Sequence, residues 1–209
     1  IQDFSSMMPL FLFDKIFSKK ILDMCAAPGG KTFQLICNKA DVVSYDKNKN
    51  KVSIMQENLR RLNFNNEIIN EDSLKISSQN KFDIVIIDAP CSSIGTIRRN
   101  PEIFYRNSSP NFRDICSIQY KFLNKAKNLV KNNGFIIYMV CSFLNIEGEN
   151  QINMFLNENQ NFILKKFTSK NNDTKNLINE KGFFKTSPIK FRDKFLIDGF
   201  FAAQLQKNV

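Results

Sequence analysis

The sequence contains no histidine and no Cys-x-x-Cys pair, so it offers no set of zinc ligands. No apolar run approaches the roughly 20 residues that a membrane-spanning helix needs, and no signal-peptide pattern is visible. We therefore expect a protein that needs neither a metal ion nor a membrane. An odd number of dispersed cysteines is typical of a reducing compartment, so we expect a cytoplasmic location. The cysteines are Cys25, Cys37, Cys91, Cys116 and Cys141.

Two nucleotide-binding signatures are also missing. The stretch LDMCAAPGGKT, residues 22–32, is not a GxGxxG turn, which argues against a standard dinucleotide site. It also lacks the upstream glycine of GxxxxGK[ST], which argues against nucleoside triphosphate hydrolysis. A glycine turn between a strand and a helix still brings free backbone N–H groups close to a ligand, as at the cofactor site of parallel α/β sheets. The alternative is a tight turn that simply needs glycine.

Positive charge is in excess. The net charge is +10 in 209 residues, which favours an anionic partner, most often nucleic acid. The alternative is an AT-rich genome, because Lys, Asn, Ile and Phe are all abundant.

A hydrophobic content of 43% in this length predicts one domain, residues 1–209, with its own core, and we expect a monomer. Because the chain opens at Ile1 rather than at methionine, we also expect it to be a piece of a longer protein.

Apolar runs and amphipathic segments alternate along the chain. Apolar positions at steps of three and four predict helices, and the continuous run FDIVIID predicts a strand buried on both faces. This alternation predicts an open α/β fold with a mostly parallel seven-stranded sheet and helices on both faces. Residues 168–192 are polar and predict a loop. The predicted strands are 19–25, 41–46, 66–72, 82–88, 134–142, 161–167 and 198–206, and the predicted helices are 31–39, 52–62, 115–129 and 146–158.

Acidic residues stand at the ends of the second and third predicted strands. Asp46 is placed to bind two ribose hydroxyls, and it is also placed to cap the next helix. Asp72 is placed to reach an adenine amino group, or else it is a solvated loop acid. Together with the glycine turn, these residues indicate a cofactor that contains adenosine, without saying which one.

Five motifs resemble, in the same order, the RNA cytosine-carbon-5 methyltransferases of the Sun/nucleolar-protein family, and the first and last are similar to the bacterial 16S rRNA methyltransferase B branch. The resemblance covers about Gln2 to Lys207. It implies an S-adenosylmethionine enzyme with a Rossmann-like class I methyltransferase fold, whose last strand (198–206) is antiparallel. It also implies an N-terminal RNA-binding domain that this chain lacks. The motifs are QDFSSMMP, LDMCAAPGGKT, DAPCS, CS…EGEN and DGFFAAQLQK.

The resemblance also implies site residues. DAPCSSIG stands where the family more often has DAPCSGTG, so Ser93 takes the place of a glycine. VCS stands where the family usually has TCS, so Val140 takes the place of a threonine. The family's cofactor residues map onto Cys25, Ala26, Ala27, Pro28, Gly29, Gly30, Lys31, Asp46, Asp72 and Asp88.

Cys91 and Cys141 both follow predicted strands, at the edge where ligands bind, whereas Cys37 and Cys116 fit small buried positions. Carbon 5 of cytosine becomes nucleophilic when a thiolate adds to carbon 6, and an acid near N3 and the amino group stabilises the ring. Asp88 suits that role. The resemblance implies that Cys141 attacks and Cys91 helps release. The DAPCS motif by itself resembles the nucleophile motif of DNA cytosine methyltransferases, which leaves the opposite assignment as the alternative.

The loop TIRRNPEIFYR places Arg98, Arg99 and Arg106 where they could contact RNA phosphates, and Phe104 or Tyr105 could stack on an exposed base. A solvated loop is the alternative. We therefore predict an S-adenosylmethionine-dependent RNA cytosine-carbon-5 methyltransferase that acts on rRNA, with 16S rRNA implied by the resemblance. Two alternatives stand beside it: the same chemistry on tRNA, and a non-catalytic RNA-binding or ribosome-assembly module.

Overall fold

The structure is a computed structural model that describes residues 2–79, 81–106, 108–191 and 195–208. Within these residues the main sheet has eight strands: seven in the order β3-β2-β1-β4-β5-β10-β6, and β7, which pairs with β10. A second sheet contains β8 (Ile189–Phe191) and β9 (Phe195–Ile197). The main-sheet strands are β1 (Lys20–Asp23), β2 (Asp41–Tyr45), β3 (Glu67–Ile69), β4 (Phe82–Asp88), β5 (Val130–Val140), β6 (Phe162–Lys165), β7 (Phe184–Thr186) and β10 (Phe200–Lys207).

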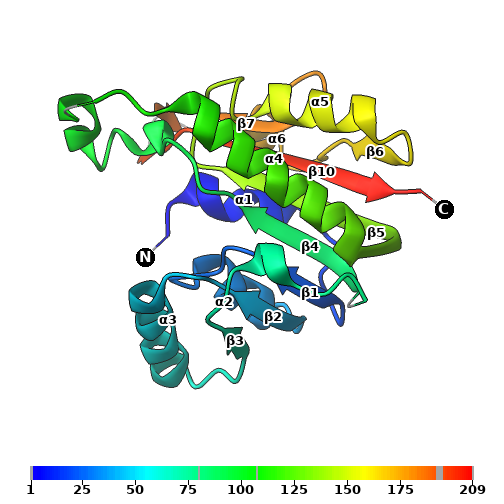
Figure 1. The fold of residues 1–209 in the computed structure, drawn as a ribbon. Helices are drawn as coiled ribbons and strands as arrows, with labels where there is room; N and C mark the ends of the chain where they lie inside the picture. The colour runs from blue at the N-terminus through cyan, green and yellow to red at the C-terminus, as the bar shows by residue number, and fades with distance from the viewer. Residues whose placement is uncertain (1, 80, 107, 192–194, 209) are drawn as a thin grey trace.

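Helices cover both faces of this sheet. In Figure 1, α4 (Phe112–Leu129) crosses the front of β4 and β5 with α5 (Glu149–Glu158) beside it, while α1 (Phe4–Leu12) lies behind. None of the helices in the described part of the chain is long and apolar enough to cross a membrane. The remaining helical segments are α2 (Gly30–Cys37), α3 (Lys49–Leu62), α6 (Asn172–Lys175), η1 (Ser73–Lys75), η2 (Ile94–Thr96) and η3 (Pro101–Tyr105).

The alternation of side chains along β4 produces two cores, one on each face of the sheet. Val85 and Ile87 pack with residues of α4 and α5, whereas Ile84 and Ile86 pack with residues of α1 and α2. An unbroken apolar run, here Ile84 to Ile87, is required for this double burial. The prediction of a buried strand at 82–88 is therefore confirmed.

The four central strands are parallel, because β1 pairs in parallel with β2 and β4, and β4 with β5. Strand β10 runs antiparallel to β5, as the resemblance implies. The Rossmann-like methyltransferase fold is thus confirmed. Since parallel strands end at the same edge, the carboxyl ends of β1, β2, β4 and β5 lie together, and ligands bind at such an edge.

Three predictions about the elements were wrong. The sheet has eight strands rather than seven, because β7 adds to β10. Residues 168–192 are not simply a loop, since they include α6, β7 and β8; residue 192 lies outside the described residues. Strand β5 begins at Val130, four residues before the predicted start. For β7 and for the start of β5, long-range pairing outweighs local composition, with Phe184 opposite Ala202 and Val130 opposite Phe82.

Candidate active site

The turn after β1 carries the first part of the site. Gly29 occupies the left-handed region with φ 109°, and a side chain there would overlap the ring of Phe33. Glycine therefore permits the sharp change of direction from the turn into α2. The turn is fixed to neighbouring strands, because Met24 N donates to Ile86 O and Ala26 N donates to Tyr45 O, both at 3.0 Å.

A cavity of about 440 Å³ opens beside this turn, within the size range of small-molecule sites. Asp46 reaches it from the end of β2. One Asp46 oxygen accepts from Ala27 N at 3.1 Å and the other from Asn48 N at 2.8 Å. A carboxylate has about four acceptor positions, so both oxygens can accept further hydrogen bonds. Asp46 is not the N-cap of α3, because Asn48 holds that position.

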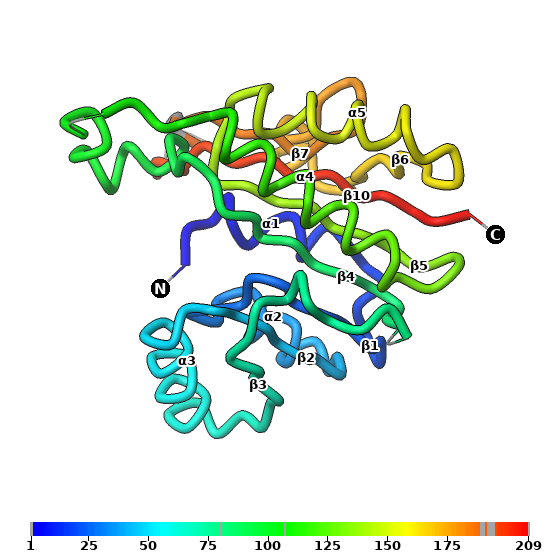
Figure 2. Tube along the Cα trace, in the orientation of Figure 1, coloured from blue at the N-terminus to red at the C-terminus, as the bar shows by residue number. Residues whose placement is uncertain are grey.

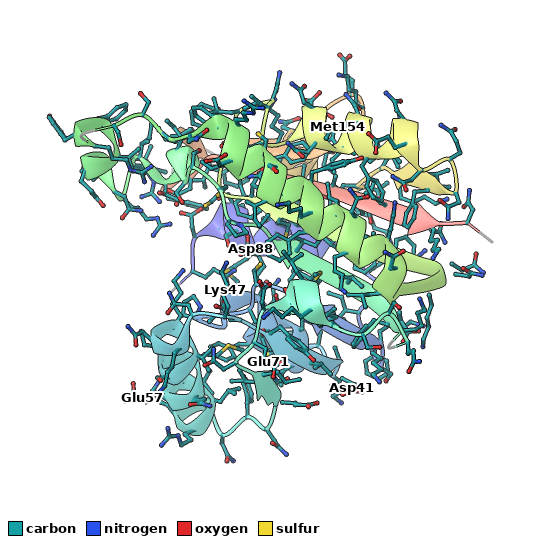
Figure 3. The ribbon with its side chains drawn as sticks, viewed as in Figure 1. Asp41, Lys47, Glu57, Glu71, Asp88 and Met154 are labelled. Carbon is teal, nitrogen blue, oxygen red and sulfur yellow. The ribbon has the colours of Figure 1, made fainter. Side chains whose placement is uncertain are left out.

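Asp72 lines the same cavity from the loop after β3. It is half-buried and caps η1 by accepting from Leu74 N at 3.0 Å, so it is not a freely solvated loop acid. Figure 3 shows Lys47 and Asp88 approaching this edge of the sheet from the start of α3 and the end of β4. Asp41 lies at the opposite end of β2.

Some residues that the sequence motifs did not indicate also line the 440 Å³ cavity. Lys47 directly follows Asp46 and Lys51 lies in the first turn of α3, so their position could have been inferred from the same βα turn. Phe122 comes from the middle of α4. Its place in the apolar face of that helix predicted only a core position, and nothing local separates the two roles.

The two expected thiols meet. Cys91 follows β4 by three residues, and Cys141 follows β5 directly. Because β4 and β5 are paired neighbours with Asp88 opposite Met139, both loops leave the sheet side by side. The Cys91 and Cys141 sulfurs are 3.0 Å apart.

This thiol pair is electrostatically asymmetric. The hydrogen bond from Cys91 lowers the pKa of Cys141, and a contact with the Ser93 hydroxyl acts in the same direction. The same hydrogen bond, together with burial, raises the pKa of Cys91. Cys141 is therefore the member of the pair that more readily becomes a thiolate, the nucleophilic form.

A buried carboxylate holds the loop that carries Cys91. Glu147, fully buried, accepts from the Ser92 backbone N–H at 2.8 Å and from the Ser92 hydroxyl at 2.6 Å. Gln119 of α4 donates to the same carboxylate at 3.2 Å. A buried carboxylate that accepts three hydrogen bonds fixes the position of the groups that donate them. Loss of a donor would leave a buried carboxylate oxygen without a partner, which is costly.

The Cys141 loop is held by Gly95. The N–H of Gly95 donates to Cys141 O at 3.0 Å, and its carbonyl accepts from Gly199 N at 2.8 Å. A β-carbon on Gly95 would lie 1.9 Å from Gly199 O. Only glycine therefore fits where η2 bridges Cys141 and the segment leading into β10.

A second cavity, of about 320 Å³, lies against the first. Asp88 and Cys141 line both cavities. In the second one, the Lys31 ammonium is 2.6 Å from Asp88 Oδ2 and donates to the Ser6 hydroxyl of α1 at 3.0 Å. The side chain of Lys31 is almost fully buried.

The residues expected around the cofactor divide between the two cavities. Cys25, Ala27 and Asp88 line both, and Asp46 and Asp72 line only the larger one. Burial raises the pKa of Cys25, so this residue is a neutral thiol in the wall. Gly29 is in neither lining and shapes the turn. The residues found only in the smaller cavity are Ala26, Pro28, Gly30 and Lys31.

All three expected RNA-binding arginines are engaged within the chain, and two of them, Arg98 and Arg99, pair with carboxylates. Arg98 donates to Asp198 at 3.1 Å and to Asp3 at 2.7 Å. Arg99 pairs with Asp198 at 2.6 Å, while its side chain remains 49% exposed. The arginines thus join the loop after β4 to both ends of the chain, an arrangement that local sequence does not indicate.

Arg106 lies in an arm between η2 and α4, drawn in green and projecting from the body of the molecule in Figure 2. Its guanidinium donates to Ser92 O at 3.0 Å, which connects the arm to the Cys91 loop. Phe104 and Tyr105 are 69% and 83% exposed. Two aromatic rings left largely in water next to a ligand-binding edge suggest a contact surface.

Comparisons with known proteins identify the family of this chain and several relatives. A family model described as 16S rRNA methyltransferase RsmB/F matches residues 13–206. The probable ribosomal RNA small subunit methyltransferase B of Bacillus subtilis is 33% identical over 171 residues, covering 78% of this chain and 38% of that protein. The ribosomal RNA small subunit methyltransferase B of Photorhabdus laumondii is 34% identical over 161 residues, covering 75% and 38%. This chain thus spans little more than a third of the length of these relatives.

Two solved structures are similar in fold to almost the whole of this chain. NSun6 from Pyrococcus horikoshii with SFG has a TM-score of 0.82 at 25% identity, covering 99% of this chain and 52% of that chain. A methyltransferase homologue from Pyrococcus horikoshii has a TM-score of 0.77 at 27% identity, covering 99% and 67%.

Proposed function

Because this chain belongs to the 16S rRNA methyltransferase RsmB/F family, we propose that it transfers a methyl group from S-adenosylmethionine to carbon 5 of a cytosine in RNA. The proposed substrate is 16S rRNA, and the reaction passes through a covalent bond between cysteine and cytosine. One observation supports this chemistry above all: two thiols 3.0 Å apart, with Cys141 and Asp88 on the boundary between two adjoining cavities.

The larger cavity fits S-adenosylmethionine. Asp46 has acceptor capacity left on both carboxylate oxygens for the two ribose hydroxyls, and Asp72 stands beyond it for the adenine amino group. When bound, S-adenosylmethionine supplies an electrophilic methyl group. Placing it here leaves the smaller cavity, bounded by Lys31, Asp88 and Cys141, for the target cytosine.

Cys141 begins the reaction. Its thiolate adds to carbon 6 of the cytosine, and the electron pair of the 5,6 double bond becomes available at carbon 5. Asp88 accepts a hydrogen bond from the cytosine amino group, and the Lys31 ammonium beside it offsets negative charge that develops on the ring. Carbon 5 then forms the bond to the methyl group as the bond between that group and the sulfonium sulfur breaks, and S-adenosylhomocysteine would leave with that electron pair.

Release requires a base, such as water or Cys91 in its thiolate form, to take the proton on carbon 5. Its departure restores the 5,6 double bond as the bond between carbon 6 and the Cys141 sulfur breaks, so Cys141 leaves as a thiolate. Cys91, 3.0 Å from that sulfur, assists this step. Both cysteines must stay reduced for the cycle to run, which fits a reducing, cytoplasmic setting.

RNA is held by the arm and by the charge around it. Arg106 lies next to the Cys91 loop, and the exposed rings of Phe104 and Tyr105 offer stacking surfaces for unpaired bases. Arg98 and Arg99 keep the loop in place through Asp198, and the exposed part of Arg99 contributes positive charge to the phosphate path.

Transfer of a labelled methyl group from S-adenosylmethionine tests the proposal, with purified 30S subunits, 16S rRNA and tRNA offered separately. Bisulfite sequencing of each product then locates any 5-methylcytosine. Label at a cytosine of 16S rRNA is the expected result. Label confined to tRNA would change the substrate, label at a different atom would overturn the chemistry, and binding without transfer would leave only an RNA-binding module.

A further inference from the structure

The sulfurs of Cys91 and Cys141 are placed for a second reaction besides methyl transfer. They lie 3.0 Å apart, whereas two bonded sulfurs lie about 2.05 Å apart, so a closing movement of about 1 Å would join them as a disulfide. Both cysteines are half-buried and line the 440 Å³ cavity. A molecule as small as hydrogen peroxide can therefore reach the pair from the cavity.

The thiols that line this cavity differ in reactivity towards a peroxide, because only the thiolate form attacks it. The hydrogen bond with Cys91 lowers the pKa of Cys141, and the charge of Lys31 acts in the same direction. The same hydrogen bond raises the pKa of Cys91, which stays a neutral thiol. Cys25 lines the cavity too, but burial raises its pKa. Cys141 is therefore the sulfur that a peroxide oxidises first, with a second thiol beside it to complete a disulfide.

We propose that a peroxide, as hydrogen peroxide or an organic hydroperoxide, converts Cys91 and Cys141 into a reversible disulfide that stops methyl transfer. The disulfide rests on the geometry of the thiol pair alone. Its effect on methyl transfer rests on the proposed function, in which Cys141 attacks carbon 6 of the cytosine and Cys91 assists release. The same two thiols then carry the methylation reaction and make it sensitive to oxidation.

The first step consumes the Cys141 thiolate. It attacks one oxygen of hydrogen peroxide, the O–O bond breaks, and Cys141 becomes a sulfenic acid as hydroxide leaves. The hydrogen bond to the Cys141 thiolate and the charge of that thiolate both raise the pKa of Cys91, and both weaken once Cys141 is a neutral sulfenic acid. Cys91 can then give its proton to the hydroxide, which leaves as water.

The second step closes the disulfide. The Cys91 thiolate attacks the Cys141 sulfur, the bond between sulfur and oxygen breaks, and a second hydroxide leaves. The two sulfurs have together lost two electrons, and the peroxide has gained them. A dithiol such as dithiothreitol reverses the change by thiol–disulfide exchange and returns both thiols. While the disulfide lasts, no Cys141 thiolate is available to add to carbon 6.

Peptide mapping without reduction tests the disulfide. Cys91 and Cys141 fall in separate tryptic peptides, so a disulfide between them joins two peptides that mass spectrometry detects together. The reduced protein is treated with hydrogen peroxide and its remaining thiols are alkylated, and the joined peptides are the expected result. Cys141 found only as sulfinic acid, or joined to another cysteine, would overturn the proposal. In Cys91→Ala, Cys141 should pass beyond the sulfenic acid to a sulfinic acid that dithiothreitol does not reduce.

Cys37→Ser is the matched control, because Cys37 is an exposed thiol at the end of α2 and lines neither cavity. This variant should form the joined peptides as readily as wild type. Loss of the joined peptides in Cys37→Ser would assign the reaction with peroxide to Cys37 and overturn the proposal.

Methyl transfer by wild type and by Cys37→Ser should fall in proportion to the fraction of joined peptides and return after dithiothreitol. Methyl transfer that persists in fully joined protein would overturn the effect on activity. The mapping needs neither RNA nor cofactor, so it is independent of the proposed function. If the joined peptides form but the chain methylates no cytosine, the disulfide stands and the function fails. If cytosine is methylated and no joined peptides form, the function stands and the disulfide fails.

Discussion

The sulfurs of Cys91 and Cys141 lie 3.0 Å apart, and the hydrogen bond between them lowers the pKa of Cys141 while it raises that of Cys91. The sequence presents the two cysteines as an almost symmetric pair, each after a strand of the same sheet. The folded chain removes the symmetry by giving Cys141 a second partner, the Ser93 hydroxyl oxygen, and a position directly after β5. This asymmetry favours Cys141 as the attacking thiol.

Loss of each cysteine should arrest the reaction at a different stage. Cys141→Ala should abolish methyl transfer and form no covalent adduct, because no thiolate is left to add to carbon 6. Cys91→Ala should transfer the methyl group but stall before release, so that a protein–RNA adduct accumulates. Denaturing electrophoresis with labelled RNA measures the adduct. A persistent adduct from Cys141→Ala, with none from Cys91→Ala, would reverse the two roles.

Asp46 should contribute directly to cofactor affinity. Asp46→Ala removes a charged acceptor for the ribose hydroxyls, so calorimetry should show S-adenosylmethionine binding weakened by roughly 1–3 kcal/mol. Asp41→Ala is the matched control, since Asp41 is an exposed carboxylate at the other end of the same strand (Figure 3). Equal affinities for wild type and Asp46→Ala would remove Asp46 from the binding site.

The arm should contribute to RNA binding through stacking and charge in separable ways. Tyr105→Ala should weaken binding of single-stranded RNA by roughly 1–3 kcal/mol with the salt dependence unchanged. Arg106→Gln should reduce the slope of log affinity against log salt by about 0.7, the effect of one phosphate contact. Fluorescence anisotropy over a salt series measures both.

The control for the arm is Phe17→Ala, because Phe17 is 66% exposed and precedes β1, at the edge of the sheet away from the site. Its affinity for RNA should equal that of wild type. A loss of affinity from Phe17→Ala as large as that from Tyr105→Ala would show that any exposed ring gives the effect, and the arm would lose its assigned role.

Local sequence patterns were sufficient to predict the strands that carry the candidate site. The run is apolar from Ile84 to Ile87 because both faces of β4 are covered there, and such burial is visible in the sequence. The meeting of Cys91 and Cys141 also followed, since parallel strands end at one edge. The segment around β7 could not be predicted in this way, because its place depends on pairing with β10, whose residues lie later in the chain.

Directions of side chains within the site were harder to predict than positions. Lys31 was expected with the cofactor residues, and its ammonium pairs with Asp88, another of them, in the smaller cavity. The motif specifies which turn carries the lysine, while the packing of α1 and its Ser6 hydroxyl determine where the ammonium goes. The partner of Arg99, Asp198, lies 99 residues away, and only the closed fold brings them together.

Asp23 should make the stability of the protein depend on pH. It is fully buried at the end of β1 and accepts from the Thr32 hydroxyl at 2.8 Å. Burial raises its pKa to about 7, above the unfolded value of about 3.9. Between these values the folded state binds a proton that the unfolded state does not. The contribution of Asp23 to the free energy of unfolding is therefore fully present below about pH 4, and it is lost as the pH rises through about 7.

Asp23→Asn should remove this dependence, because asparagine matches the shape and charge of the protonated acid. In urea unfolding, the free energy of unfolding of Asp23→Asn relative to wild type should rise by up to about 3 kcal/mol between pH 5 and pH 8. Asp41→Asn, an exposed carboxylate at the start of β2, should follow the wild-type curve. Parallel pH curves for wild type and Asp23→Asn would mean that Asp23 is already ionised in the folded protein at pH 5.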